Sequence, residues 1–225
     1  MAPKNYENYI QSLRDARFLI LLILILFLLV LSPFLDEFIH TRIMTDIFLT
    51  VIFIFIILTI RVKRSQAIIA SFLALPLIMA TWSEYIVEIK TISLFVRVFG
   101  ALFFGYAAVN ILRLIANAEK ITRETIFAAI VAYLMIALMW AFLYMILEMT
   151  LPGSFSFPQK EYRAEAMRFE YFSFITITTL GYGDIVPVTT LARSLCILEA
   201  VIGQLYLVVA VAWLVGMHVS QRMRE

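Results

Sequence analysis

Residues 169–184 read FEYFSFITITTLGYGD and combine two features that decide how the chain is built. The first is an apolar stretch from Phe169 to Thr179, which at about 11 residues is too short to cross a bilayer as a helix. The second is the run TTLGYGD at 178–184, in which glycines alternate with larger residues. A short apolar helix that ends at membrane depth is tolerated only where it is buried in protein or lines water. The pattern therefore predicts a re-entrant helix followed by an extended strand.

The composition places the whole chain in a membrane. Hydrophobic residues make up 63% of the 225 residues and charged residues 15%, against about 45–50% and about 25% in soluble domains. A chain of this size cannot bury so much apolar surface in its own core. The net charge of +2, with no concentrated basic run, does not favour a nucleic-acid partner. The single cysteine, Cys196, excludes an intramolecular disulfide.

Six other apolar segments are long enough to cross a bilayer as helices. They are Phe18–Leu35, Ile43–Ile60, Gln66–Trp82, about Thr91–Ile115, Arg123–Glu148 and Leu191–Val219. The predicted fold class is therefore an all-α membrane protein with six transmembrane helices, a re-entrant pore helix and an extended strand. The first segment has a basic flank but no small-residue cleavage site after it, so we expect a retained helix rather than a signal peptide.

The lysines and arginines at the ends of these segments predict the orientation. One side holds Lys4, Arg14, Arg17, Arg61, Lys63, Arg64, Arg113, Lys120, Arg123, Arg222 and Arg224. The other side holds Arg42, Lys90, Lys160, Arg163 and Arg168, with Arg193 near its surface. Because cytoplasmic loops carry the excess of positive charge, we expect a multi-pass plasma-membrane protein with both termini in the cytoplasm.

The strand after the short helix has the residues that an ion pathway needs. A potassium ion loses its hydration shell in a narrow pore, and rings of backbone carbonyls replace it. Carbonyls point to one side of an extended strand only if alternate residues take unusual backbone angles, which Gly181 and Gly183 adopt at little cost. Leu180 and Tyr182 would then point away and brace the strand, and Thr179 could add a hydroxyl ligand.

With its polar outer loop, short helix, strand and following apolar helix, this part of the chain resembles the potassium channel family over about Arg123–Val219. TTLGYGD resembles the family's selectivity filter, and Asp184, Pro187 and Arg193 match residues that follow it. The resemblance implies ion binding by Thr179, Leu180, Gly181, Tyr182 and Gly183, with support from Thr178 and Asp184. One filter copy per chain implies a homotetramer, so the partners are potassium ions, the lipid bilayer and three identical subunits. No cofactor, catalytic residue or enzymatic activity is expected.

The resemblance divides the chain into segments. We expect a cytoplasmic N-terminal segment at 1–17, a four-helix voltage-sensor-like domain at 18–115, a linker at 116–122, a pore domain at 123–219 and a cytoplasmic tail at 220–225. The absence of a soluble domain indicates a prokaryotic inner-membrane channel. The opening stimulus stays open, as does the question whether the first four helices pack on their own pore domain or on a neighbour's.

Several positions in the pore domain have two interpretations or depart from the family. Tyr171 and Phe172 stand where many relatives carry two tryptophans beside the filter, which puts inactivation behaviour in doubt. Gly203 falls where simple bacterial relatives place a gating hinge, although a lone glycine in a membrane helix also serves close packing. Leu207, Val211 and Val215 share a helical face and form either an apolar inner constriction or an ordinary packing surface.

The fourth segment lacks a voltage sensor's arginine array. Steep gating takes three or four charges per subunit, because one charge crossing 100 mV contributes only about 2.3 kcal/mol. Here only Arg97 and Arg113 are present. We expect Arg97 to pair with Glu84, Glu88 or Asp46, and predict a channel that is not steeply voltage-gated.

Glu199 lies inside the sixth segment, where a carboxylate is costly unless it is paired or protonated. It is either satisfied by a hydroxyl or backbone group behind the filter, or it is a pH-sensitive group that acts on filter conductance. Both interpretations stay open from sequence.

Three other classes of protein share features with this sequence. Gly181-Tyr182-Gly183-Asp184 fits the Gly-X-Gly-Asp of intramembrane aspartyl proteases, but that chemistry needs a second deep aspartate, and Asp46 is the only other one even shallowly in a predicted span. A potassium uptake transporter of the related kind would carry four divergent filter copies. A non-conducting channel-like subunit would be expected to have a damaged filter.

Overall fold

The computed structural model describes residues 16–35, 41–60, 64–83, 90–157 and 165–223. It contains seven helices within those ranges: α2 (Arg17–Leu35), α3 (Thr41–Ile60), α4 (Arg64–Ser83), α5 (Lys90–Ala116), α6 (Arg123–Thr150), α7 (Glu165–Ile177) and α8 (Thr190–Arg222). Two short strands, β1 (Phe155–Ser156) and β2 (Val186–Pro187), complete the described part. The predicted apolar segments therefore all lie in helices.

Four described helices are long and apolar enough to cross a membrane, namely Arg64–Trp82, Leu94–Ala116, Arg123–Thr150 and Thr190–Gln221. Two shorter apolar helical stretches, Arg17–Val30 and Asp46–Ile60, lie in α2 and α3. A helix rises about 1.5 Å per residue, so the four longer helices match the thickness of a hydrocarbon core. The chain is a helical, multi-pass membrane protein.

The short helix α7 begins earlier and ends earlier than predicted. The sequence prediction ran from Phe169 to Thr179, whereas α7 runs from Glu165 to Ile177. The four residues from Glu165 to Arg168 include charged side chains, so they lie outside the apolar stretch, but they form the first turn of the helix. At the other end, Thr179 takes a φ of 60°, which a right-handed helix does not allow.

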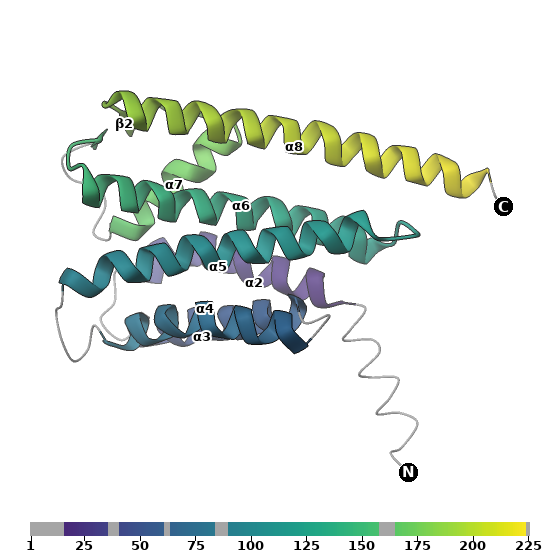
Figure 1. The fold of residues 1–225 in the computed structure, drawn as a ribbon, viewed down its shortest axis with the longest axis horizontal. Coiled ribbons are helices and arrows are strands. Elements are labelled where there is room, and N and C mark those ends of the chain that lie inside the picture. The colour runs from purple at the N-terminus through teal and green to yellow at the C-terminus, as the bar shows by residue number, and fades with distance from the viewer. Residues whose placement is uncertain (1–15, 36–40, 61–63, 84–89, 158–164, 224–225) are drawn as a thin grey trace, which may run out of the picture.

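Helix α6 lies at the centre of the fold (Figure 1). It packs on α5 on one side and on α7 and α8 on the other, and α2 also contacts it. Much of its buried surface is small, including Ala128, Ala132, Ala137 and Ala141. Inside a membrane the hydrophobic effect does not drive helices together, so helix association relies on close packing. Small residues allow neighbouring helix backbones to approach closely. This close approach positions α7 and α8 against a common support.

Of the first four helices, α2 and α5 contact α6 of the same chain, while α3 and α4 pack on α2 and α5. Helix α5 ends at Ala116 and α6 begins at Arg123, so the connection is short and the two helices run antiparallel as neighbours (Figure 1). Thr122 caps α6, because its hydroxyl accepts from the Thr125 backbone N–H at 3.3 Å. The 116–122 link therefore joins two helices that pack along each other.

The outer connection between α6 and α7 is tied to the start of α8. Strands β1 and β2 pair antiparallel, with Phe155 opposite Pro187 and Ser156 opposite Val186. The Glu148 carboxylate, near the end of α6, accepts from the backbone N–H groups of Gly153 at 2.8 Å and Phe155 at 3.1 Å. These bonds fix the two ends of the segment that holds α7 and the TTLGYGD strand.

Candidate functional site

The TTLGYGD strand alternates its backbone conformation. Thr179, Gly181 and Gly183 have φ angles of 60°, 51° and 80°, and Thr179 is the only non-glycine residue with positive φ in the described part of the chain. The residues on either side of each of these three positions have negative φ. In an ordinary β-strand successive carbonyls point in opposite directions, and this alternation of φ frees the TTLGYGD strand from that pattern. This is the alternation that the glycine spacing predicted, extended by one residue to Thr179.

The strand begins by capping α7. The backbone N–H groups of Thr178, Thr179 and Gly181 donate to the carbonyls of Phe174, Thr176 and Ile175 at 3.2, 3.0 and 3.0 Å. The last carbonyl of the helix, that of Ile177, accepts instead from the hydroxyl of Tyr133 in α6 at 2.9 Å. The C-terminal carbonyls that a helix leaves unpaired are thus satisfied, and the inner end of the strand is fixed to α6.

The described part of the single chain leaves the TTLGYGD strand exposed. Every residue from Thr178 to Asp184 is exposed, and Leu180 and Tyr182 are 53% and 70% exposed. A Cβ built on Gly181 or Gly183 meets nothing within 4 Å. The bracing role predicted for Leu180 and Tyr182 therefore has no partner among the described residues of the same chain.

Of Tyr171 and Phe172, for which the resemblance led us to expect tryptophans, Tyr171 reaches the C-terminal end of the strand. Its hydroxyl donates to the Asp184 carboxylate at 2.7 Å, and the other carboxylate oxygen accepts from the Ile185 N–H at 3.0 Å. Phe172 is buried, and its ring packs against Tyr144 and Phe155 at centroid distances of 5.2 and 5.3 Å. Tyr171 thus braces the strand directly, and Phe172 holds α7 against α6 and β1.

Glu199 of α8 is fully buried behind α7. One carboxyl oxygen lies 2.5 Å from the Ser173 hydroxyl of α7, and the other accepts a hydrogen bond from the Tyr144 hydroxyl of α6. The Ser173 hydroxyl also donates to the Ala137 carbonyl of α6 at 2.7 Å. The first interpretation offered from sequence, a carboxyl satisfied by hydroxyls behind the strand, describes this geometry.

Gly203 of α8 packs closely on the end of α7. A Cβ at this position would lie 2.7 Å from the Ile177 carbonyl oxygen and 2.6 Å from an Ile177 side-chain carbon. Helix α8 continues without interruption through this position. This contact agrees with the interpretation that Gly203 serves close packing. The role of Gly203 as a hinge stays a prediction.

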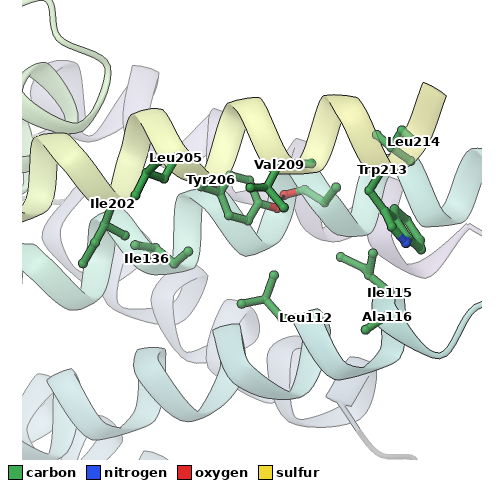
Figure 2. A pocket seen from close by; sticks show the side chains of 12 residues that line it. Leu112, Ile115, Ala116, Ile136, Ile202, Leu205, Tyr206, Val209, Trp213 and Leu214 are labelled. Carbon is green, nitrogen blue, oxygen red and sulfur yellow. Dashed lines mark hydrogen bonds between the residues drawn. The ribbon is translucent and has the colours of Figure 1, made fainter. Parts of the chain in front are cut away.

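Leu207, Val211 and Val215 lie on an exposed face of α8 at 40%, 58% and 57% exposure. The opposite face of α8 lines an apolar groove of about 530 Å³ between α5, α6 and α8 (Figure 2). Its lining includes Ile202, Tyr206, Val209 and Trp213. At 3.6 residues per turn these two sets lie on opposite sides of α8. The candidate constriction therefore does not face this groove.

Arg97 contacts the far end of α6, where its guanidinium donates to the Met149 sulfur. Two of its three predicted partners, Glu84 and Glu88, lie outside the described residues. Asp46 is buried in α3. Arg113 lies in the last turn of α5.

Sequence reasoning missed Tyr133, Tyr144 and Ser173. The two tyrosines are eleven positions apart in α6, which places them on one helical face about three turns apart. Ser173 interrupts an otherwise aromatic run between Phe172 and Phe174. A polar residue at such a position in an apolar helix indicates a hydrogen-bonding partner nearby, and that signal was available in the sequence.

A short helix, α7, whose capped end continues into a strand with alternating φ packs against two long apolar helices, α6 and α8. Residues 121–219 match the family described as ion channel. The match confirms the resemblance to a channel family. The pore domain at 123–219, which we predicted from that resemblance, stays a prediction. Comparisons with curated proteins and with solved structures found no significant match.

Proposed function

We propose that four copies of this chain form a potassium-selective channel that conducts potassium passively across the plasma membrane. The observation that carries the proposal is the alternation of positive φ at Thr179, Gly181 and Gly183 in a strand that the described residues of its own chain leave exposed. Such a backbone suits rings of carbonyl oxygens that replace the hydration shell of an ion.

The roles of the filter residues follow from this backbone. The residues from Thr179 to Gly183 coordinate the ions through their backbone carbonyls, and the Thr179 hydroxyl adds a ligand at the inner end. The C-terminal end of α7 carries the negative end of its helix dipole, which favours a cation in the cavity below. Tyr171 holds Asp184 at the outer mouth through the 2.7 Å hydrogen bond.

A single strand lines only one side of a pathway, so a closed filter needs several chains. The exposed Leu180 and Tyr182 side chains support assembly, since neighbours would cover them. So does the exposed apolar surface of α8, which includes Ile197, Val201, Leu205 and Val208. One filter copy per chain makes the assembly a homotetramer.

In this proposal α2 and α3 complete six membrane spans, both termini are cytoplasmic, and α7 enters from the outside. The setting is a prokaryotic inner membrane. Helix α8 lines the cavity, with Leu207, Val211 and Val215 as the candidate inner constriction. With only Arg97 and Arg113 in α5, opening depends weakly on voltage.

The test is a planar-bilayer recording of the purified full chain under a potassium/sodium gradient. We expect a reversal potential near that of potassium. Reversal near zero would reject the selectivity, and absence of current from protein that assembles as a tetramer would reject conduction.

The chain offers a matched pair of variants for this recording. Gly183 in the filter and Gly153 in the outer loop have nearly equal φ angles of 80° and 83°, and a Cβ meets nothing within 4 Å at either. Alanine therefore strains both backbones by a similar amount, roughly 1–2 kcal/mol. We expect Gly183→Ala to lose selective current and Gly153→Ala to keep it. Equal loss in both variants would contradict a special role for the filter backbone.

A further inference from the structure

Three helices meet at one buried polar cluster behind the filter strand, formed by Glu199, Ser173 and Tyr144. All three side chains are fully buried. Glu199 comes from α8, Ser173 from the middle of α7, and Tyr144 from α6. The cluster therefore ties the helix that precedes the filter to both long helices of the pore domain.

The hydrogens in this cluster can be counted. There are three oxygen–oxygen contacts: Tyr144 hydroxyl to Glu199 Oε2, Ser173 Oγ to Glu199 Oε1 at 2.5 Å, and Ser173 Oγ to the Ala137 carbonyl at 2.7 Å. A carbonyl oxygen has no hydrogen, so the single Ser173 hydrogen belongs to the bond with Ala137. The single Tyr144 hydrogen belongs to its bond with Oε2.

The contact between Ser173 and Glu199 then lacks a hydrogen unless the carboxyl supplies one. A protonated Oε1 donates to Ser173 Oγ and gives each contact one hydrogen. An ionised Glu199 has none to give, so two oxygens would lie 2.5 Å apart with no hydrogen between them. The geometry therefore fits the neutral acid.

The charges around the cluster lead to the same result independently. The titratable groups that interact with the Glu199 carboxyl are Tyr144 and Tyr133 of α6 and Cys196 of α8, all of them neutral in their ordinary state. No lysine, arginine or histidine of the described ranges pairs with it, and Arg193 donates instead to the Pro187 carbonyl at 3.3 Å. A buried carboxylate without a cation is costly at membrane depth.

We propose that Glu199 is held as the neutral carboxylic acid, and that the proton it donates to Ser173 fixes α7, and with it the filter, between α6 and α8. This makes Glu199 a positioning residue, and its effect on conduction rests on the proposed channel function. Glutamine reproduces the same pattern of hydrogen bonds, because its amide N–H donates where the acid does and its carbonyl accepts from Tyr144.

The protonation state is tested by infrared spectroscopy of the full-length protein at neutral pH, as a difference between wild type and Glu199→Gln. All other carboxyl groups cancel in this difference. We expect wild type to show the C=O stretch of a protonated carboxyl that the variant lacks. The carboxylate stretches in its place would overturn the proposal.

The hydrogen bond that Glu199 donates to Ser173 is tested by Ser173→Ala. Ser173→Thr is the conservative variant, because it keeps the hydroxyl. We expect Ser173→Ala to shift the Glu199 C=O band and Ser173→Thr to restore its position. A band that Ser173→Ala leaves unmoved would overturn the bond. Should Glu199→Gln fail to assemble, this series still identifies the band, because only a protonated Glu199 responds to Ser173.

Recordings separate this proposal from the channel function. We expect Glu199→Gln to keep the wild-type potassium reversal potential at every pH tested, and Ser173→Ala to shorten filter openings more than Ser173→Thr does. A spectrum of ionised Glu199 together with selective currents would overturn the positioning role and leave the channel standing. Unselective currents with a protonated Glu199 would reject potassium selectivity and keep the protonation state.

Discussion

Gly203 of α8 lies so close to Ile177, the last residue of α7, that a Cβ on the glycine would come within 2.7 Å of the Ile177 carbonyl oxygen. The obstacle is backbone as well as side chain, so it cannot turn away without moving the first residues of the TTLGYGD strand. We expect Gly203→Ala to destabilise the assembled protein by about 1–3 kcal/mol through overpacking. Thermal unfolding of the purified assembly measures this loss.

Gly216 is the matched control for this substitution, because it lies in the same helix and a Cβ there meets nothing within 4 Å. Alanine is favoured over glycine in a helix by about 1 kcal/mol, so Gly216→Ala should leave stability unchanged or raise it. If Gly203→Ala and Gly216→Ala change the thermal stability by the same amount, the close contact with Ile177 is not the reason for a glycine at position 203. A changed open probability at unchanged stability would support the hinge instead.

The Tyr133 hydroxyl donates to the same Ile177 carbonyl, from the α6 side. We expect Tyr133→Phe to cost about 1 kcal/mol, the usual net contribution of one hydrogen bond, and to alter single-channel conductance because the inner end of the filter loses a support. Denaturant unfolding and bilayer recording measure the two effects on the same protein.

Tyr206 supplies the control for Tyr133. Its hydroxyl donates to the Ala129 carbonyl at 2.6 Å, and its ring lies 5.5 Å from that of Tyr133. Tyr206→Phe therefore removes a similar bond between α8 and α6 that does not touch α7. We expect a similar stability loss with unchanged conductance. Equal changes of conductance in both variants would show that the Ile177 carbonyl is not the sensitive point.

Sequence alone predicted the features that depend on local composition. The apolar segments and the glycine spacing gave the positions of the long helices and of the strand, because span length and backbone freedom are properties of short stretches. The partners of Glu199 were not predicted, because Ser173 and Tyr144 are 26 and 55 positions away and only the packing of α6, α7 and α8 brings them together.

The two interpretations of Gly203 also show that sequence alone does not predict contacts between distant parts of the chain. A glycine in an apolar helix fits both a hinge and a close contact, and the sequence holds nothing that separates them. The distance to the Ile177 carbonyl depends on where α7 ends. That end depends on Thr179, whose positive φ is not expected of a β-branched residue.

The bond between Tyr171 and Asp184 joins α7 to the last residue of the TTLGYGD strand. We expect Tyr171→Phe to remove it with no loss of packing and to make conduction decline faster during sustained opening. Asp184→Ala should have at least a similar effect, because it leaves the Tyr171 hydroxyl without this acceptor. The double variant should equal the stronger single one, since both substitutions remove the same bond. Single-channel recording over long openings measures the decline. Additive effects would show that the two residues act separately.

The last prediction concerns voltage. Arg97 of α5 donates a hydrogen bond to the Met149 sulfur in α6, and we expect this contact to hold the guanidinium in place. One charge that crosses the whole field contributes about 2.3 kcal/mol per 100 mV. Wild-type open probability should therefore be nearly flat over roughly ±150 mV in a planar bilayer, since a fixed arginine moves no charge. Arg97→Gln should leave its slope unchanged, as should Arg113→Gln at the other end of α5. A steep wild-type activation that Arg97→Gln flattens, and that Arg113→Gln does not, would show that Arg97 moves through the field.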